Sequence, residues 1–265
     1  MPAADHRAHA HLLHRQARAL TLTVLGSAGT FAYPGNPCSG YLLRTTTTSI
    51  WLDAGPGTFA ALQEHIPLAE VDAIVLSHEH PDHWIELPVV RNAARYVMGI
   101  DHLAVFGTAG TRRLAEAVIG TPLPPPIEWT EISDGSAARI GDINLRFAVT
   151  DHPVETLAVR VEAHGRVMAY SADTGPAWSF AALDPEGLGF DLALCEATLA
   201  EAEEGVAHHL SGEQAGAMAR AAGVRRLAIT HLYEDVAGER VDAASGDHAF
   251  DGPVEVALSG HTFTV

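Results

Sequence analysis

The sequence predicts an α/β protein, and its two similar halves suggest a four-layer sandwich. Three observations lead to this fold class: short apolar runs rich in β-branched residues recur as strand candidates, helix-favouring segments follow them, and the alternation occurs in two halves of the chain. The 265 residues, 47% of them hydrophobic, are enough for a large core.

The first half of the chain is expected to hold a series of strands followed by a helix. The strands fall at residues 21–25, 41–44, 49–52 and 71–77, and the helix near 86–98. A threonine run between Arg44 and Ser49 predicts a hairpin turn. A proline-rich connector at 122–126 leads into a further strand at 127–130.

The second half is expected to add more strands and a well-capped helix. Strands are expected at 143–150, 166–171, 192–195 and 227–230. The helix at 212–222 starts from Ser211, which forms a capping box with Gln214, and Gly223 stops it. No long linker or repeat interrupts the chain, so we expect one domain over 20–265, preceded by a flexible or helical arm at 1–19.

The hexad His78-Glu79-His80-Pro81-Asp82-His83 carries the strongest functional signal in the chain. Alternate residues of an extended segment point the same way, so His78 and His80 can bind one ion while Asp82 and His83 reach another. Imidazole and carboxylate ligands without thiolate suit zinc, with manganese or iron as substitutes. The hexad therefore predicts a site for two divalent metal ions.

Three more candidate ligands follow strand-like runs, where an α/β architecture gathers its active site. His152 comes shortly after the run at 143–150, Asp173 after 166–171, and His231 after 227–230. Taken singly, such residues are more often structural histidines or turn aspartates. Their order after the hexad makes them candidate ligands.

Together with Asp53 in Trp51-Leu52-Asp53-Ala54-Gly55, these motifs resemble, in sequence order, the five motifs of the metallo-β-lactamase superfamily of metal hydrolases. The resemblance spans roughly residues 20 to 265 and implies the αββα fold. It also implies a division of the ligands: His78, His80 and His152 on one metal, Asp82, His83 and His231 on the other, and Asp173 bridging both. Asp53 would hold the hexad loop from behind the metals, and a simple turn aspartate is the alternative.

Glu196 in Glu196-Ala197-Thr198 and His209 in His209-Leu210-Ser211 resemble a paired element of the phosphodiesterase branch, which includes ribonuclease Z. Such a histidine can donate to a phosphate oxygen or protonate a leaving alkoxide, while a glutamate on its other nitrogen fixes the tautomer. The expected catalytic residues are this pair together with Asp82 and Asp173. The alternative for Glu196 and His209 is an ordinary pair of residues on the surface. The helix start at Ser211 is a candidate for phosphate binding.

Charge narrows the choice of substrate. The formal net charge of −17 would repel a polyanion such as transfer RNA, and the sequence shows no basic patch to compensate. Ribonuclease Z members carry a substrate-gripping arm between the motifs that match His152 and Asp173, where this chain has only 20 residues. We therefore expect a small phosphodiester and no nucleic-acid partner, with ribonuclease Z-like cleavage of RNA 3′ ends as the alternative.

Less specific segments resemble bacterial enzymes described as atypical cyclic-nucleotide phosphodiesterases. These segments are Ser39-Gly40-Tyr41-Leu42-Leu43, Asp151-His152-Pro153 and Phe250-Asp251-Gly252-Pro253-Val254. The resemblance implies cleavage of a cyclic nucleotide such as 3′,5′-cyclic AMP by a hydroxide held at the two metals. A lactonase or thioester hydrolase of the same superfamily would use the same ligands, but it would leave the Glu196 and His209 pair without a role.

The remaining features concern location and assembly. No apolar run approaches the roughly 20 residues of a membrane span, and the polar, histidine-rich start of the chain lacks a signal-peptide core. Cys38 and Cys195 lie far apart in sequence, so we expect no disulfide and a cytoplasmic location. Superfamily relatives are often dimers, and a homodimer stays open because the sequence assigns no interface.

Overall fold

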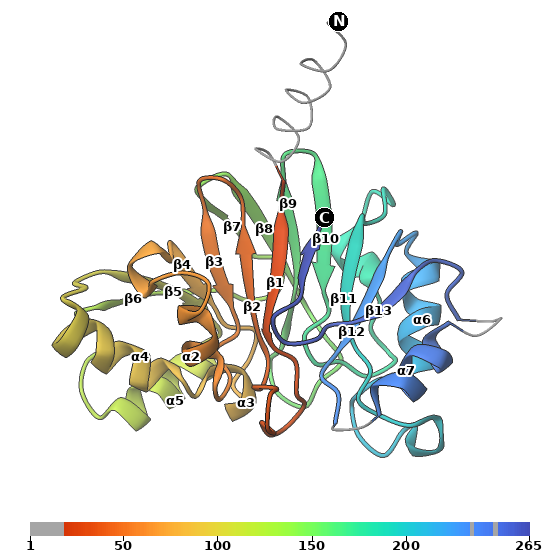
Figure 1. Ribbon diagram of the computed structural model, residues 1–265, viewed down its shortest axis with the longest axis horizontal. Helices are drawn as coiled ribbons and strands as arrows, with labels where there is room; N and C mark the ends of the chain where they lie inside the picture. Colours follow the sequence, from red (N-terminus) through yellow and green to blue (C-terminus); the bar gives the residue numbers. More distant parts are fainter. Residues whose placement is uncertain (1–18, 234–235, 246–248) are drawn as a thin grey trace, which may run out of the picture.

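The computed structural model describes residues 19–233, 236–245 and 249–265. Two mixed sheets pack face to face between outer layers of helices (Figure 1). This arrangement confirms the predicted αββα four-layer sandwich. The arm predicted for residues 1–19 lies, except for Ala19, outside the described residues.

The first sheet is antiparallel at one edge and parallel at the other. Its strands, in spatial order, are β14 (Thr262–Thr264), β1 (Thr21–Gly26), β2 (Gly40–Arg44), β3 (Ser49–Leu52), β4 (Ala73–Val75), β5 (Leu103–Gly107) and β6 (Ile127–Glu131). The pairs from β3 to β6 are parallel. Because Thr264 of β14 lies opposite Thr21 of β1, the C-terminal strand returns to the sheet in which the described chain begins.

The second sheet has the same mixture of parallel and antiparallel pairs. Its strands, in spatial order, are β13 (Val254–Val256), β12 (Leu227–Thr230), β11 (Leu192–Glu196), β10 (Arg166–Tyr170), β9 (Leu157–Ala163), β8 (Ile143–Val149) and β7 (Ala137–Ile140). The pairs from β13 to β10 are parallel, and those from β10 to β7 are antiparallel.

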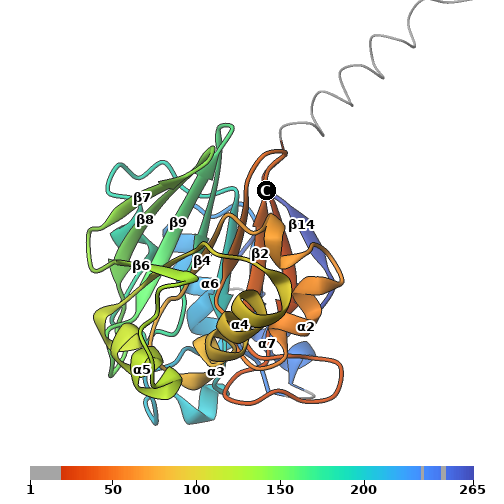
Figure 2. The ribbon, with the colours of Figure 1, turned by 90° about the vertical axis from the view of Figure 1, so that its left-hand side faces the viewer.

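Helices form the outer layers. Those beside the first sheet are α2 (Thr58–Gln63), η1 (Leu68–Glu70), α3 (Pro81–Trp84), α4 (Leu87–Ala93), η2 (Ala94–Met98) and α5 (Ala109–Ile119). Those of the second half are η3 (Phe180–Leu183), η4 (Glu201–Glu203), α6 (Gly212–Ala221) and α7 (Ala237–Ala244). Figure 2 shows α2, α4 and α5 in front of the first sheet, and Figure 1 shows α6 and α7 beside the second.

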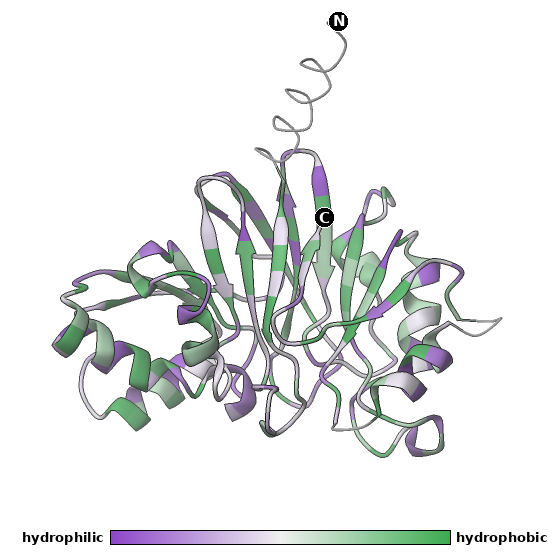
Figure 3. Ribbon diagram, in the orientation of Figure 1, coloured by the Kyte–Doolittle hydropathy of each residue, from purple (hydrophilic) through white to green (hydrophobic). Residues whose placement is uncertain are grey.

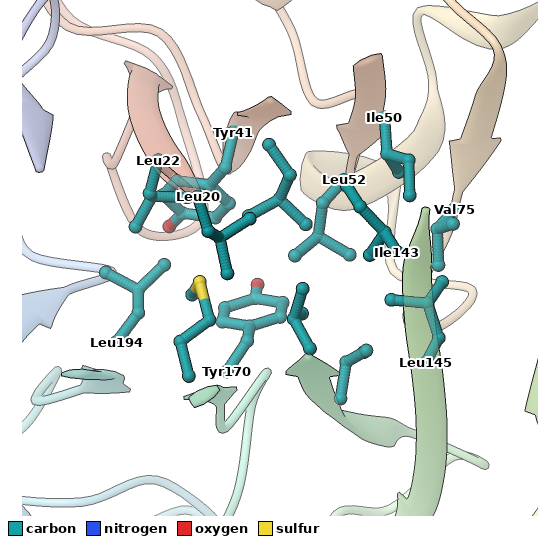
Figure 4. Packing of buried hydrophobic residues seen from close by; sticks show 14 of the residues in the cluster. Leu20, Leu22, Tyr41, Ile50, Leu52, Val75, Ile143, Leu145, Tyr170 and Leu194 are labelled. Carbon is teal, nitrogen blue, oxygen red and sulfur yellow. The ribbon is translucent and has the colours of Figure 1, made fainter. Parts of the chain in front are cut away.

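The main core lies between the two sheets. Along β8 the side chains of Ile143, Leu145 and Phe147 are buried while Asn144 and Arg146 are exposed, which is the period-two pattern expected of a strand with one solvent-facing side. Ile50, Leu52 and Val75 of the first sheet lie opposite Ile143 and Leu145 across the core (Figure 4). Figure 3 shows hydrophobic residues running along the central strands. Each such buried side chain stabilises the fold by about 1.5–3 kcal/mol.

Two local expectations, the hairpin turn after Arg44 and the capping box at Ser211, are also confirmed. The Thr45 amide donates to the Thr48 carbonyl at 2.9 Å and closes the predicted hairpin between β2 and β3. Ser211 and Gln214 form the predicted capping box of α6. Cys38 and Cys195 are buried and free. Within the described ranges, no helix combines the length and the apolar character needed to cross a membrane.

Candidate metal centre

The residues singled out in the sequence converge from the ends of strands in both sheets. Asp53 follows β3, Asp173 follows β10, and His231 follows β12. These strands belong to the parallel parts of their sheets, whose carboxyl ends meet at one edge. The short helix α3 lies at the lower edge of the sandwich in Figure 1 and carries Asp82 and His83.

One group of ligand atoms comes from His78, His80, His152 and Asp173. Its four atoms lie within 4.8 Å of one another. His80 Nδ1 is 3.1 Å from His152 Nε2, and His78 Nε2 is 3.6 Å from Asp173 Oδ2. The structure thus brings together the three histidines predicted for one metal.

A second group comes from Asp82, His83 and His231, whose ligand atoms also lie within 4.8 Å of one another. The Asp82 Oδ2 atom is 3.7 Å from His83 Nε2 and 3.3 Å from His231 Nε2. All three residues are buried. They are the residues that the resemblance assigns to the other metal.

Asp173 lies between the two groups and faces each with a different oxygen. Its Oδ2 is 3.6 Å from His78 Nε2 and 3.9 Å from His152 Nε2. Its Oδ1 is 3.3 Å from His83 Nε2 and 3.6 Å from His231 Nε2. A carboxylate in this position can contact two ions at once. We call these seven residues, His78, His80, Asp82, His83, His152, Asp173 and His231, the His/Asp cluster.

The buried polar atoms of the cluster fit divalent metal ions. His78 Nε2, His83 Nε2 and Asp173 Oδ1 are buried and have no hydrogen-bond partner, although they converge on the same small volume. Buried polar atoms without partners are rare because each costs free energy. Imidazole nitrogens and carboxylate oxygens gathered in this way are ligands of divalent metals.

The other ring nitrogen of most cluster histidines is already held by a protein group. His83 Nδ1 is 2.8 Å from Asp53 Oδ2, His231 Nδ1 is 2.8 Å from Thr198 Oγ1, and His152 Nδ1 is 3.2 Å from the His208 carbonyl. A proton on each Nδ1 leaves Nε2 free to bind a metal. The tautomer needed for metal binding is therefore set by the protein.

Asp53 fastens the start of the hexad loop to the second sheet. Its Oδ1 accepts the Ser77 amide at 2.8 Å, and its Oδ2 accepts the Ser77 hydroxyl at 2.9 Å and the Tyr170 hydroxyl at 2.8 Å. Sequence reasoning did not identify Ser77 or Tyr170, and it named Thr198 only as part of the Glu196-Ala197-Thr198 motif. A buried tyrosine hydroxyl needs a partner, so the strand-end position of Tyr170 was the available signal.

Strained backbone surrounds the cluster. Thr30, Asp53, Ala172 and His231 have φ angles of 63, 58, 50 and 59°. Within the described chain only His164 joins them as a non-glycine residue with positive φ. Such residues concentrate at functional sites, where the surrounding contacts hold them in place.

The histidines of the cluster differ in the direction in which their surroundings shift their pKa. Burial and the neighbouring His83 hold the pKa of His78 well below its usual value. Burial alone would lower the pKa of His83, but the carboxylates of Asp173, Asp82 and Asp53 raise it well above 6.5. Burial would raise the pKa of Asp173, yet His231, His83 and His78 keep it well below 3.8. The cluster thus holds ionised carboxylates, whose charge attracts cations.

His209 and Glu196 form the predicted pair at the rim of the cluster. His209 Nδ1 lies 2.8 Å from Glu196 Oε1, and the His209 ring centroid is 5.4 Å from those of His152 and His231. Burial would lower the pKa of His209, but the hydrogen bond and charge of Glu196 raise it to about 9. Glu196 also accepts the Thr174 amide at 2.7 Å and the Thr198 hydroxyl at 2.7 Å. The glutamate therefore links His209 to the His231 side of the cluster.

Ser211 and His208, which are close in sequence to His209, form hydrogen bonds with other protein groups. The Ser211 hydroxyl is buried, donates to Glu204 Oε1 at 2.6 Å and accepts the Gln214 amide at 3.2 Å, so a phosphate contact would require it to give up Glu204. The phosphate-binding role of Ser211 stays a prediction. His208 is exposed and lies 3.1 Å from Asp151 Oδ1, while its carbonyl supports His152.

The αββα sandwich with a His/Asp cluster at one edge defines the class of metallo-hydrolases. The chain belongs to the β-lactamase superfamily, because the family model of the β-lactamase superfamily domain matches residues 48–232. It is therefore a hydrolytic enzyme of that superfamily.

Individual relatives agree with this assignment. An uncharacterized protein of Mycobacterium leprae is 32% identical over 273 residues, covering 97% of this chain and 93% of the relative. A ribonuclease Z of Methanopyrus kandleri is 26% identical over 264 residues, covering 84% of this chain and 91% of the relative. The crystal structure of the metallo-β-lactamase fold protein YhfI from Bacillus subtilis matches with a TM-score of 0.83 and 25% identity, covering 93% of this chain and 100% of that one.

Proposed function

We propose that this chain hydrolyses a small phosphodiester, with a cyclic nucleotide such as 3′,5′-cyclic AMP as the substrate. The observation that carries the proposal is the His209 and Glu196 pair at the rim of the His/Asp cluster. The cluster alone would serve ester or amide hydrolysis of many kinds. The pair adds a proton donor beside it, which cleavage of an alkyl phosphodiester requires because the leaving alkoxide is a strong base.

Each residue has a task in this proposal. His78, His80 and His152 would hold one divalent metal ion, Asp82, His83 and His231 a second, and Asp173 would contact both. Zinc suits this donor set, and manganese or iron can replace it. When bound, the ions would lower the pKa of a water molecule and withdraw charge from the phosphoryl oxygens.

His209 would transfer a proton to the departing ribose oxygen. Its Nδ1 is engaged by Glu196, so the proton to be donated is on Nε2. Glu196 keeps the ring oriented through a bond of 2.8 Å and, through the Thr198 hydroxyl, is linked to His231. Asp53 would keep His83 and the hexad loop in position.

Two observations favour a small substrate over RNA. The chain carries a formal net charge of −17, which disfavours a polyanion. Between His152 and Asp173 the structure has β9, a turn and β10, so the interval contains no inserted arm. The similarity to a ribonuclease Z supports phosphodiester chemistry, while these features argue for a smaller phosphodiester.

The test is release of 5′-AMP from 3′,5′-cyclic AMP by zinc- or manganese-loaded protein, with a His209→Ala variant beside the wild type. We expect turnover by the wild type and a loss of about 10²–10⁴-fold in the variant, the range for removal of a general acid. Metal content, measured by plasma mass spectrometry, should be equal in both proteins. If the loaded wild type leaves cyclic AMP intact but cleaves a lactone or thioester, the phosphodiesterase proposal is wrong.

A further inference from the structure

Among the described residues, the exposed large aromatic side chains are those of Phe31, Tyr96 and Tyr233. Phe31 is 58% exposed and Tyr233 is 36% exposed. Tyr96 lies on η2, whereas Phe31 and Tyr233 belong to segments that contact the His/Asp cluster. An exposed aromatic ring close to a functional site can bind a flat ligand by stacking.

The segment that carries Phe31 contacts two cluster residues. The Thr30 amide donates to Asp82 Oδ2 at 2.9 Å, so Phe31 follows directly after a residue bonded to the cluster. A Cβ atom on Gly29 would lie 2.8 Å from the His231 carbonyl oxygen and 3.0 Å from its Nδ1. The backbone at Gly29 therefore packs directly against His231, and a side chain there would separate them.

The segment that carries Tyr233 runs beside the Phe31 segment. Tyr233 is two residues from His231, and the intervening Leu232 forms a parallel bridge with Ala28. The Gly29 amide donates to the Leu232 carbonyl at 3.1 Å, and the Leu232 amide donates to the Ser27 carbonyl at 3.1 Å. Two segments far apart in sequence, each carrying an exposed aromatic residue, thus lie side by side next to His231.

The loop around Phe31 is fixed by its own hydrogen bonds. The Ala28 amide donates to the Pro37 carbonyl at 3.0 Å and closes the loop at its base. Tyr33 and Asn36 exchange backbone hydrogen bonds of 3.1 and 3.0 Å, and the Asn36 side chain accepts the Ser27 amide at 3.0 Å. A ring on a preformed loop binds a ligand without the cost of ordering the loop.

We propose that Phe31 and Tyr233 form an aromatic wall that stacks against the base of the substrate while the His/Asp cluster receives its phosphodiester. This inference rests on the proposed function and deepens it, because it names the residues that would recognise the base of the nucleotide. Stacking uses the flat face that every base has. The wall therefore selects for the presence of a base and discriminates weakly between bases.

The experiment compares two substrates that share the scissile bond. One is 3′,5′-cyclic AMP, and the other is the same cyclic phosphodiester on a ribose without a base. The proteins are the wild type, Phe31→Ala, Tyr233→Ala, the double variant and the matched control Tyr96→Ala, which removes an exposed ring elsewhere. For cyclic AMP we expect KM to rise roughly tenfold for each ring removed, with kcat within about threefold of wild type, since removal of a stacking ring affects binding.

The base-free substrate should show unchanged kinetics in every variant, and Tyr96→Ala should match the wild type on both. Phe31→Trp should retain the low KM for cyclic AMP. If KM for the base-free substrate rises as much as that for cyclic AMP, the rings have only a structural role. If cyclic AMP is cleaved with the same KM by the double variant, the wall is absent and the phosphodiesterase stands.

Equilibrium dialysis of cyclic AMP against the same proteins separates the two proposals. Binding that weakens in the double variant, without turnover by the wild type, would support the aromatic wall and reject the phosphodiesterase. A wild type that neither binds nor cleaves cyclic AMP would reject both. Thermal melting of each variant, expected within a few degrees of wild type, checks the fold.

Discussion

Asp53 is the residue on which the geometry of the hexad depends. Its two oxygens accept from Ser77, Tyr170 and His83, at distances of 2.8 to 2.9 Å, and the residue is fully buried. An asparagine has the same shape but keeps only one acceptor oxygen, and its amide would face donors. The His83 ring would lose the partner that fixes its tautomer.

We therefore expect Asp53→Asn to lower metal affinity or activity by about 10–100-fold, the range found when partners of metal-binding histidines are changed. Titration with zinc followed by mass spectrometry measures the affinity. Asp72→Asn is the matched control, because Asp72 also accepts a backbone amide, that of Ser49 at 2.8 Å, but lies outside the cluster. Equal metal affinity in Asp53→Asn and wild type would show that the aspartate is only a turn residue.

In the proposed mechanism Glu196 acts on the substrate only through His209. A double-variant cycle can therefore test whether the two residues act together. If the glutamate acts by orienting the histidine, removing it should matter little once the histidine is gone. We expect Glu196→Gln and His209→Ala each to lower kcat, and the double variant to fall within about threefold of His209→Ala alone. Kinetics and metal content of the four proteins measure the cycle. Losses that multiply would mean that Glu196 works elsewhere, through Thr198 and His231.

At the scale of elements, the carboxylate of Asp142 joins a turn of the second sheet to a turn of the first sheet. Asp142 lies between β7 and β8, and its Oδ1 accepts the hydroxyls of Thr45 and Thr48 in the β2–β3 turn at 2.7 and 2.6 Å. Burial would raise the pKa of Asp142, but the hydrogen bonds from Thr48 and Thr45 lower it from 3.8 to about 2. His164 Nε2 lies 3.0 Å from Asp142 Oδ2 and adds attraction when protonated.

The sign of the pH dependence follows from this depressed pKa. The ionised carboxylate contributes its full stability above the unfolded value of 3.8, and the contribution is lost as pH falls through about 2. We expect Asp142→Asn to destabilise the protein by about 1.5–3 kcal/mol at pH 7, the size of hydrogen bonds to a charged group. The difference should shrink as pH falls from about 4 towards 2. Urea unfolding of the wild type and the variant across this pH range measures the difference. A difference that stays constant would contradict the role of the ionised Asp142 carboxylate. The control is Asp251→Asn, which changes an exposed surface ion pair.

Three elements differ from what the sequence predicted, two in their bounds and one in being present without having been predicted. The strand expected at 71–77 is shorter, because β4 ends at Val75 and the Ser77 amide turns away to the Asp53 side chain. The expected helix near 86–98 is present as α4 and continues as the π-helix η2. It ends at Gly99, whose φ is 65°. The segment of α5 was not assigned, although Thr108 caps its start and Gly120 ends it. These features depend on contacts in space rather than on hydrophobic period.

At the scale of the whole molecule, the seven cluster residues could be named from the sequence because metal-binding chemistry leaves a local pattern. The hexad repeats one side-chain type at close spacing, and the later cluster residues follow apolar runs that end at one edge of a sheet. The roles of Ser77, Tyr170 and Thr198 could not be found in this way. Each is a hydroxyl in or beside an apolar run, and only its partner across the fold shows its role.

The cluster draws on both sheets, and this couples metal binding to folding. His78 follows β4 of the first sheet, while Asp173 and His231 follow β10 and β12 of the second. An ion that contacts ligands from both sheets binds the folded chain and not the separated strands. At a hundredfold excess over its dissociation constant, each ion would add about 2.7 kcal/mol to the free energy of unfolding.

We therefore expect a chelator to lower the melting temperature by roughly 5–10 °C for each ion removed, since 1 kcal/mol corresponds to roughly 2–4 °C in a protein of this size. Zinc should restore the original value in differential scanning calorimetry. His78→Ala should respond weakly to zinc because it lacks a ligand, whereas His102→Ala, which removes an exposed histidine paired with Glu128, should respond like the wild type. A wild type with the same melting temperature before and after chelation would mean that the ions do not hold the two sheets together, and the bridging position of Asp173 between ions would then have to be abandoned.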